Sequence, residues 1–214
     1  MKTLDRLGKD LSVLKEENLL RSLKLKTGLV DFSSNDYLGI SANEGLQEKC
    51  KEFFVDGLGS GGSRLLSGNS IYSEQLEIVL AERHLQESAL LFNSGYAANL
   101  GFFSAIPNRN STVIYDEKIH TCIKDGMRLS LAKKVAFKHN DLEQLEKRLK
   151  SSSNETFVAI ESIYSMDGDQ ALLLEIAELC QKYEANLVVD EAHSTGVYGK
   201  KGAGVVSELG LDEK

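Results

Sequence analysis

The stretch Leu187-Val188-Val189-Asp190-Glu191-Ala192-His193 gives the clearest indication of the fold. It joins an apolar run to a carboxylate, and an imidazole follows three residues later. Strands that are buried on both faces of a sheet have such continuous apolar runs. In open α/β sheets, ligands bind outside the carboxyl ends of the strands. The stretch therefore predicts a strand over 187–190, with Asp190 and His193 at the edge of the sheet where a ligand binds.

Strand and helix patterns alternate in the sequence before this stretch. Short apolar runs predict strands, and apolar residues at intervals of three and four predict helices. The strands are expected at 88–92, 112–115, 134–137 and 156–160, and the helices near 96–105, 118–130, 141–150 and 171–183. Repeated strand–helix units predict an α/β fold with a mostly parallel sheet and helices on both faces.

The N-terminal part of the chain has a different pattern. Leucines at helical spacing predict a helix within 4–25, and a short strand is expected at 29–32. We assign residues 1–40 to an N-terminal helix and short strand, and 41–214 to the large domain. The leucine stripe needs a cover, either from the same chain or from a partner subunit. Doubly wound domains normally continue with further strands, so the large domain is expected to be incomplete at its C-terminal end.

Composition and charge argue against several classes of protein. The formal net charge of −7 is spread over 214 residues, which disfavours nucleic acid or an anionic membrane as the main partner. No apolar run approaches a membrane span, and the start of the chain lacks the pattern of a signal peptide. Three distant cysteines without a CxxC pair fit a reducing cytoplasm, and fit neither a disulfide framework nor a zinc site.

Several residues have an ordinary structural interpretation. Asn140, with Glu143 three residues later, fits a capping box for the helix that follows. Asp169 is a candidate cap for the next helix along the chain. We interpret His84, within a helix, and His139, beside a helix cap, as structural residues.

The pattern Gly57-x-Gly59-x-x-Gly62 has the letters of a dinucleotide-binding fingerprint. Its context differs, because the fingerprint follows a strand and opens a helix, whereas this pattern follows a predicted helix. We expect a flexible loop that lets the backbone approach a ligand or another subunit.

Polar residues follow the ends of several predicted strands. Ser94, Gly95 and Tyr96 lie where a strand leads into a helix, and free N–H groups at a helix start bind anions, most often phosphate. An ordinary N-cap at Ser94 explains the same residues equally well. His120 and Ser165 follow the strands at 112–115 and 156–160, although a lone histidine and a polar turn are more often structural.

One chemistry fits a phosphate anchor, a histidine and a strand-end aspartate, namely that of pyridoxal phosphate (PLP). The cofactor withdraws electrons efficiently only while its pyridine nitrogen is protonated, and a carboxylate against that nitrogen keeps the proton in place. An opposite charge at such a distance shifts a pKa by about 1–3 units. Asp190 is the candidate for this role. A metal site at Asp190, Glu191 and His193 is the rival, and it lacks further ligands at suitable spacing.

Five motifs together identify a family. They are Phe32-Ser33-Ser34-Asn35-Asp36-Tyr37-Leu38-Gly39, Gly59-Ser60-Gly61-Gly62-Ser63-Arg64, Ser94-Gly95-Tyr96-Ala97-Ala98-Asn99, Ser165-Met166-Asp167-Gly168-Asp169 and Asp190-Glu191-Ala192-His193-Ser194-Thr195-Gly196. In this order they resemble the α-oxoamine synthases, a branch of the fold-type I PLP enzymes. The resemblance implies the large domain of a fold-type I PLP-dependent transferase.

The resemblance also implies the roles of individual residues. Asp190 would hold the pyridine nitrogen, His120 would stack on the ring, and His193 would lie near the phenolic oxygen, so these three are the implied catalytic residues. The implied cofactor contacts are Ser94, Gly95, Tyr96, His120, Ser165, Asp190 and His193. The implied substrate contacts are Arg21, Asn35 and His120. No metal is implied.

Within the branch, the motifs are most similar to those of members that condense L-alanine with a pimeloyl thioester in biotin biosynthesis. The thioester would be carried by CoA or by an acyl carrier protein, and carbon dioxide would be lost. A ligase acting on glycine and acetyl-CoA, or another family member, is the alternative, and a transaminase is the nearest enzyme of a different reaction type. The family works as homodimers.

The family's Schiff-base lysine is expected beyond Lys214. It lies on a Ser/Thr-x-x-Lys turn well after the Asp-x-x-His motif, and Lys200 and Lys201 stand in a different context. Without that lysine the 214 residues alone are expected to be inactive, and a catalytically silent partner subunit is a further alternative.

Overall fold

The computed structural model describes residues 2–23, 28–53 and 59–211. The chain divides into two compact units, Met1–Asn35 and Asp36–Lys214. The helices are α1 (Lys2–Glu16), α2 (Glu44–Lys51), α3 (Ile71–Arg83), α4 (Gly95–Ala105), α5 (Thr121–Leu129), α6 (Leu142–Lys150), α7 (Leu173–Lys182) and α8 (Val205–Glu208). The strands are β1 (Thr112–Asp116), β2 (Lys133–Phe137), β3 (Thr156–Glu161) and β4 (Asn186–Asp190).

In the first unit, α1 ends at Glu16 and does not extend through 4–25 as expected. Asn18 adopts a left-handed φ of 57°, and the amide of Leu19 donates to the carbonyl of Leu14 at 2.8 Å. The amide of Asn18 donates to Lys15, which completes a Schellman motif that stops the helix. The strand expected at 29–32 is wrong. A strand forms only against a partner, and within the described residues nothing pairs with this segment.

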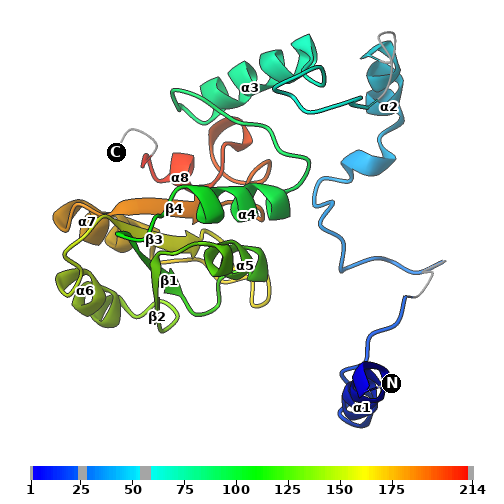
Figure 1. The fold of residues 1–214 in the computed structure, drawn as a ribbon. Coiled ribbons are helices and arrows are strands. Elements are labelled where there is room, and N and C mark those ends of the chain that lie inside the picture. Colours follow the sequence, from blue (N-terminus) through cyan, green and yellow to red (C-terminus); the bar gives the residue numbers. More distant parts are fainter. Residues whose placement is uncertain (1, 24–27, 54–58, 212–214) are drawn as a thin grey trace. The chain divides into compact units, whose positions relative to one another are not determined.

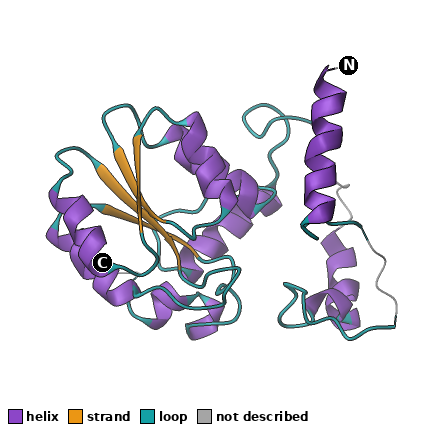
Figure 2. Ribbon diagram, turned by 90° about the horizontal axis from the view of Figure 1, so that it is seen from below, coloured by secondary structure: helices purple, strands orange, loops and turns teal. Residues whose placement is uncertain are grey.

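The second unit is built on a parallel sheet with the strand order β2-β1-β3-β4 (Figure 1). The chain moves outward from β1 to β2 and then returns past β1 to β3, so the direction of winding reverses between β1 and β3. This reversal places helices on both faces of the sheet, as Figure 2 shows. The predicted fold class is confirmed.

Side chains that alternate along each strand pack into two hydrophobic clusters, one on each face of the sheet. In β1, Ile114 faces a cluster with Leu145 of α6 and Ile176 of α7. Its neighbour Val113 faces the opposite cluster, with Ile123 of α5. Successive side chains of a strand point to opposite faces, so a strand that is buried on both faces is apolar throughout. All six residues of β3 are buried, and the four between Thr156 and Glu161 are apolar.

The two helices on the second face approach each other closely at Gly126 of α5. A Cβ atom at this position would lie 2.9 Å from the carbonyl oxygen of Asn99 and 2.9 Å from the Cβ of Phe103, both on α4. It would also lie 3.2 Å from the Cα of Leu100. The absence of a side chain at Gly126 therefore allows the backbones of α4 and α5 to come together.

The strand expected at 88–92 is also wrong, because among the described residues no other strand pairs with it. A carboxylate holds this segment instead. The amide of Leu91 donates to Glu77 Oε1 of α3 at 2.7 Å. Arg64 binds both carboxylate oxygens of Glu77, at 2.6 and 3.0 Å. The Arg64 guanidinium lowers the pKa of Glu77 to about 2, and the Leu91 amide acts in the same direction.

The capping predictions for α6 and α7 need correction. Asp141, not Asn140, caps α6, and its side chain accepts from the amide of Gln144 at 2.9 Å. Asn140 has a φ of 55°, and its amide oxygen accepts from the amide of Leu172 at 3.2 Å. Asp169 does not cap α7, because its side chain binds His139.

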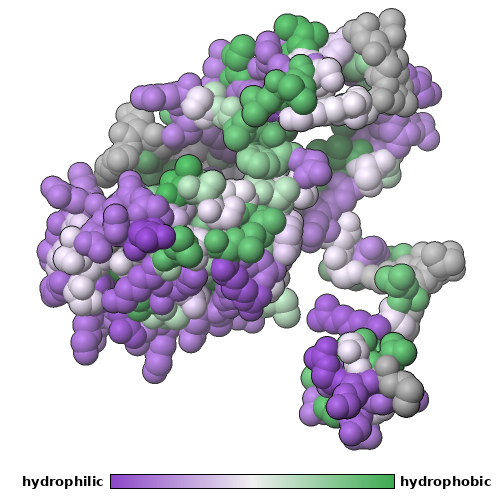
Figure 3. All heavy atoms as spheres, in the orientation of Figure 1, coloured by the Kyte–Doolittle hydropathy of each residue, from purple (hydrophilic) through white to green (hydrophobic). Residues whose placement is uncertain are grey.

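Apolar side chains also lie on the outside of the second unit. Figure 3 shows green, apolar side chains over α3, where Ile71, Leu76, Ile78 and Val79 are exposed. Exposed apolar patches of this kind often mark interfaces between proteins. Within the described residues, no helix has the length and hydrophobicity needed to cross a membrane.

Candidate active site

Three carboxylates stand at the carboxyl ends of three neighbouring strands. Asp116 ends β1, Glu161 ends β3 and Asp190 ends β4. Glu161 and Asp190 are paired in the register of β3 and β4, so two carboxylates lie side by side at this edge. The winding of the chain reverses next to them, which is the position where open α/β sheets bind ligands.

Asp190 is held by two donors from its own chain. The side chain of Asn99 on α4 donates to Oδ2 at 2.7 Å, and the amide of Ala192 donates to Oδ1 at 2.9 Å. The carboxylate stays half-buried and has lone pairs to spare. It can therefore accept a further hydrogen bond from a positively charged group.

The N-terminus of α4 lies one helical turn before Asn99. Ser94 is the N-cap, and its hydroxyl accepts from the amide of Ala97 at 3.1 Å. A Cβ atom on Gly95 would meet nothing within 4 Å, so the space before this helix end is open. The backbone amides of Gly95 and Tyr96 precede the first hydrogen-bonded turn, where helices bind anions. The same helix thus presents an anion site at its start and fixes Asp190 one turn later.

The Tyr96 side chain takes part in the packing of α4 on α5. Its hydroxyl donates to Asp125 Oδ2 at 2.7 Å. Hydrogen bonding to this carboxylate raises the pKa of Tyr96. Because the Tyr96 hydroxyl is bound to Asp125, the cofactor contact that the resemblance implies for Tyr96 would come from its backbone amide.

His120 caps α5 through its ring. Nδ1 accepts from the amide of Cys122 at 3.2 Å and lies 2.9 Å from Cys122 Sγ. In the neutral ring the proton is therefore on Nε2. Asn99 also donates to Cys122 Sγ, at 3.3 Å, so a chain of contacts joins Asp190 to His120 through Asn99 and Cys122. Burial raises the pKa of the Cys122 thiol, which keeps this link uncharged.

His193 lies three residues beyond Asp190 and is half-buried. Its Nδ1 is 2.6 Å from the hydroxyl of Tyr37, and the two ring centroids are 6.2 Å apart. The hydroxyl of Tyr37 therefore fixes the orientation of the His193 ring.

Glu161 lies between the other two carboxylates and is only 2% exposed. The amide of Ser165 donates to its Oε2 at 3.3 Å, whereas Oε1 is buried without a partner among the described residues. Burial raises the pKa of Glu161 to about 7, and the charge of Asp190 adds to the shift. Glu161 thus ties the loop that carries Ser165 to the end of β3 and retains an unused acceptor.

The structure brings the implied cofactor residues Ser94, Gly95, Tyr96, His120, Ser165, Asp190 and His193 to the carboxyl edge of one sheet or to the helix starts beside it. The implied substrate residues Arg21 and Asn35 belong to the first unit, where both are exposed. Gly57, from the glycine pattern, lies outside the described residues.

Two side chains of the site were not anticipated from the sequence. Asn99 lies four residues after Gly95, so the helical repeat was an available signal that both would face the same site. Tyr37 binds a histidine 156 residues away, and no local pattern could have revealed this contact.

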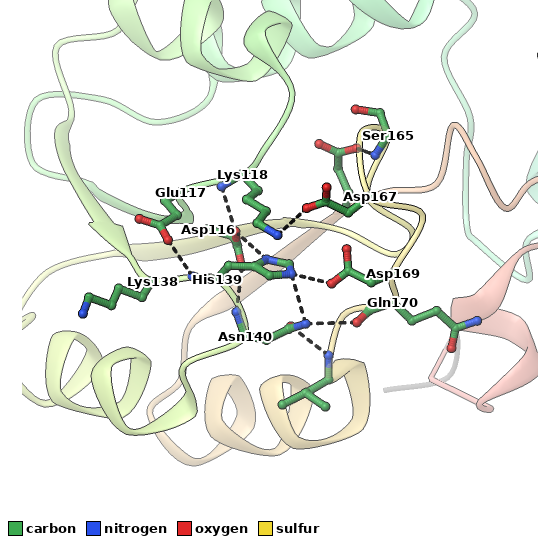
Figure 4. A network of polar contacts seen from close by, with 12 residues as sticks. Asp116, Glu117, Lys118, Lys138, His139, Asn140, Ser165, Asp167, Asp169 and Gln170 are labelled. Atoms are coloured by element: carbon green, nitrogen blue, oxygen red, sulfur yellow. Dashed lines mark hydrogen bonds and ion pairs between the residues drawn. The ribbon is translucent and has the colours of Figure 1, made fainter. Parts of the chain in front are cut away.

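A second polar cluster surrounds Asp116 (Figure 4). Asp116 is fully buried and accepts from His139 Nδ1 at 3.1 Å and from the amides of Lys118 and Asn140 at 2.9 and 3.1 Å. The other ring nitrogen of His139 is 2.5 Å from Asp169 Oδ2. This cluster ties together the loops that follow β1, β2 and β3.

Comparison with known proteins agrees with this geometry. Residues 27–213 match the family described as aminotransferase class I and II. The chain belongs to that family. Its members depend on PLP, so the expected cofactor class is confirmed at the level of the family.

Curated relatives confirm the resemblance to the α-oxoamine synthases. An 8-amino-7-oxononanoate synthase from Emericella nidulans is 42% identical over 89% of this chain and 51% of its own length. One from Lysinibacillus sphaericus is 38% identical over 98% of this chain and 58% of its own length. The chain thus spans about half the length of the curated relatives it matches.

Solved structures show the same relationship. A serine palmitoyltransferase from S. paucimobilis, solved with a bound PLP–myriocin aldimine, matches with a TM-score of 0.86 and 30% identity. The match covers 99% of this chain and 57% of that one. An 8-amino-7-oxononanoate synthase from Francisella tularensis matches with a TM-score of 0.72 and 30% identity, over 85% of this chain and 50% of that one.

Proposed function

We propose that the full-length protein is a PLP-dependent acyltransferase that condenses L-alanine with a pimeloyl thioester to give 8-amino-7-oxononanoate, a step of biotin biosynthesis. The observation that carries the chemistry is Asp190, fixed by Asn99 at the end of β4 while α4 presents its N-terminus one turn away. The names of the curated relatives support the choice of substrates.

The residues present fit the cofactor at both of its ends. The backbone amides of Gly95 and Tyr96 would hold the phosphate, since the space before them is open and the helix dipole favours an anion there. Asp190 would accept a hydrogen bond from the protonated pyridine nitrogen. Bound there, PLP supplies the electron sink for bond breaking at the α-carbon of the amino acid.

The chain's own residues would orient the reactants and hold protons. Asn99 and the amide of Ala192 keep the Asp190 carboxylate fixed, so its charge stays directed at one point. The ring of His120 is fixed by its bond to the Cys122 amide, with Nε2–H left to face the cofactor ring or the substrate. His193, fixed by Tyr37, and Ser165 would lie near the phenolic oxygen.

The proposal extends to the other predicted partners and to assembly. Arg21 and Asn35 would bind substrate, and the Schiff-base lysine would come from sequence after Lys214. The exposed apolar residues of α3, and separately the exposed leucines Leu4 and Leu11 of α1, support a homodimer. Light scattering of the full-length protein tests this assembly, and a monomer at micromolar concentration would contradict it.

The test of function is product formation by the full-length protein with PLP. With L-alanine and pimeloyl-CoA, or the pimeloyl carrier protein, we expect release of free thiol and carbon dioxide. Release with glycine and acetyl-CoA alone would move the assignment to a ketobutyrate ligase. Release with serine and palmitoyl-CoA alone would move it towards the function named for the structural neighbours. Keto-acid formation without thiol would indicate a transaminase.

A further inference from the structure

The cluster around His139 lies between the two loops that carry His120 and Ser165. The loop after β1 leads to His120, and Asp116 fixes its start by accepting from the amide of Lys118 at 2.9 Å. The loop after β3, residues 162–172, carries Ser165 and, nearer to α7, Asp169 and Gln170. In Figure 4 the ring of His139 points towards Asp116 on one side and Asp169 on the other.

His139 makes a hydrogen bond from each ring nitrogen. Nδ1 is 3.1 Å from both oxygens of Asp116, and Nε2 is 2.5 Å from Asp169 Oδ2. An ionised carboxylate can only accept, so both nitrogens must carry a proton for both bonds to exist. With both carboxylates ionised, this geometry favours the imidazolium form of His139, and the Asn140 amide group lies 3.4 Å from Nε2 as well. The side chain of His139 is only 14% exposed, which shields this pair of charged bonds from water.

The loop 162–172 has hydrogen bonds of its own as well as ties to the rest of the unit, among them the Ser162 amide to the carbonyl of Asp190 at 2.9 Å and the Ser165 amide to Glu161 at 3.3 Å. Within it, the amide of Tyr164 donates to the carbonyl of Asp169 at 2.9 Å, and the amide of Gly168 donates to the carbonyl of Tyr164 at 2.8 Å. The ring of Tyr164 packs edge-on against His139, with centroids 4.5 Å apart. His139 is thus one of the contacts that attach the loop to the ends of β1 and β2.

Two further contacts act beside His139. The Asn140 amide group donates to the carbonyl of Gln170 at 3.1 Å and accepts from the amide of Leu172 at 3.2 Å. Lys118 forms an ion pair with Asp167. Lys118 and Asp167 are both well exposed, so we expect this ion pair to add little to the attachment.

We propose that His139 is a positioning residue for the PLP site. By donating to Asp116 and Asp169 at once, it holds the loop 162–172, and with it Ser165, in a fixed position relative to the loop that carries His120. This inference rests on the proposed function for its catalytic consequence, whereas the attachment of the loop rests on the geometry alone.

The charged groups around His139 set the direction of its pH dependence. Burial lowers the pKa of His139, but the hydrogen bonds and charges of Asp169 and Asp116 outweigh burial and raise it. Tyr164 faces the ring as well, and burial raises the pKa of its hydroxyl, which keeps that group neutral. Glu117 contacts only the backbone amide of His139, at 3.3 Å. Both hydrogen bonds of His139 are therefore present below its raised pKa, and one of the two is lost as pH rises through that pKa.

The test compares H139Q and D169N with wild type and with H84Q, all in the full-length protein. H84Q makes the same change at a histidine at the C-terminal end of α3, away from the cluster. D169N is the second variant because Asp169 is 41% exposed and its loss should leave the fold intact. Hydrogen exchange, corrected for intrinsic rates, is measured for peptides covering 162–172 and, as an internal reference, for α7.

In both variants we expect exchange in 162–172 to accelerate by about 10-fold or more, since a charge-assisted hydrogen bond is lost, while α7 is unchanged. The affinity for PLP, measured by its absorbance, should fall by several-fold, and H84Q should behave as wild type. In wild type the protection of 162–172 should decline with rising pH, and this decline should be absent in H139Q.

Unchanged exchange in both variants, or equal acceleration throughout the chain, would overturn the proposal. If wild type bound no PLP, the proposed function would fail, whereas the exchange and its pH profile would still decide the role of His139. Normal PLP affinity together with faster exchange would show that His139 holds the loop without positioning the cofactor site, and would overturn the positioning role.

Discussion

Asp116 and Asp190 end strands of the same parallel sheet, separated only by β3, yet their surroundings differ. Asp116 is fully buried and receives three donors of its own chain, including the ring of His139. Asp190 is half-buried and receives two. The comparison shows when a carboxylate at the end of a strand is available for a ligand. The fold must hold the carboxylate in place and still leave it able to accept another hydrogen bond.

Removing Asp116 should have the largest effect, and the effect should be on stability. In D116A, His139 and two buried backbone amides lose their acceptor, so the free energy of unfolding should fall by about 3–5 kcal/mol. Denaturant unfolding of the full-length protein without cofactor measures the loss. A denaturation midpoint equal to that of wild type would contradict the structural role that distinguishes Asp116 from Asp190.

D190N should have a small effect on stability and a large effect on activity. Asparagine retains an acceptor for Asn99 or Ala192, so we expect unfolding within about 1 kcal/mol of wild type. Turnover should fall by about 100-fold, because the pyridine nitrogen would lose a carboxylate that shifts its pKa by roughly two units. Steady-state thiol release measures turnover. Near-normal turnover would refute the role of Asp190.

Glu161, between the two aspartates, should make stability depend on pH. Its pKa is raised to about 7 by burial and by the charge of Asp190, so the folded state holds the proton more tightly than the unfolded state. The contribution of Glu161 to stability without cofactor should therefore be greatest below about pH 5 and should fall by about 1–3 kcal/mol as pH rises through 7.

The variant E161Q should show a smaller decline, because only the contribution of His139 remains, while E143Q, the same change at an exposed residue of α6, should retain the full decline. Unfolding curves between pH 5 and 8 decide the matter. A decline in E161Q as large as that of wild type would assign the whole effect to other groups.

Asn99 should have the smallest effect, because Ala192 still fixes one oxygen of Asp190 in its absence. In N99A the affinity for PLP should weaken by about 10-fold, which corresponds to the loss of one hydrogen bond to a charged group. The dissociation constant from PLP titration tests this, with N110A at an exposed position as control. A loss as large as that in D190N would mean that Asn99 itself contacts the cofactor.

The sequence predicted the parts of the fold that depend on local patterns. The strands at 112–115 and 156–160 are largely buried, mostly apolar runs between helices on the two faces of the sheet, and the run at 187–190 forms the half-buried edge strand β4. Their identity required no knowledge of distant residues. The position of Asp190 followed from the same rule. The caps were harder, because Asn140 and Asp141 are both good capping residues. Their roles are decided by Gln170 and Leu172, some thirty residues away.

Apart from the early end of α1, which Asn18 stops locally, the failures share a physical cause, which is dependence on a distant partner. The segment 88–92 has the composition of a strand, but a strand exists only when another strand pairs with it. The contact between Asn99 and Asp190 joins residues 91 positions apart. The sequence neighbours of His139 indicate a structural histidine, and only the fold shows that it connects Asp116 with Asp169.

Gly126 limits which mutations can compensate for one another. A methyl group there would meet Phe103, which a smaller residue could relieve, but it would also meet the carbonyl oxygen of Asn99, which no side-chain substitution removes. Relief would require α4 to move away from α5 and to carry Gly95 and Asn99 with it. We therefore expect that second-site suppressors of G126A will be rare, since any shift that restores packing displaces both ends of the proposed cofactor site.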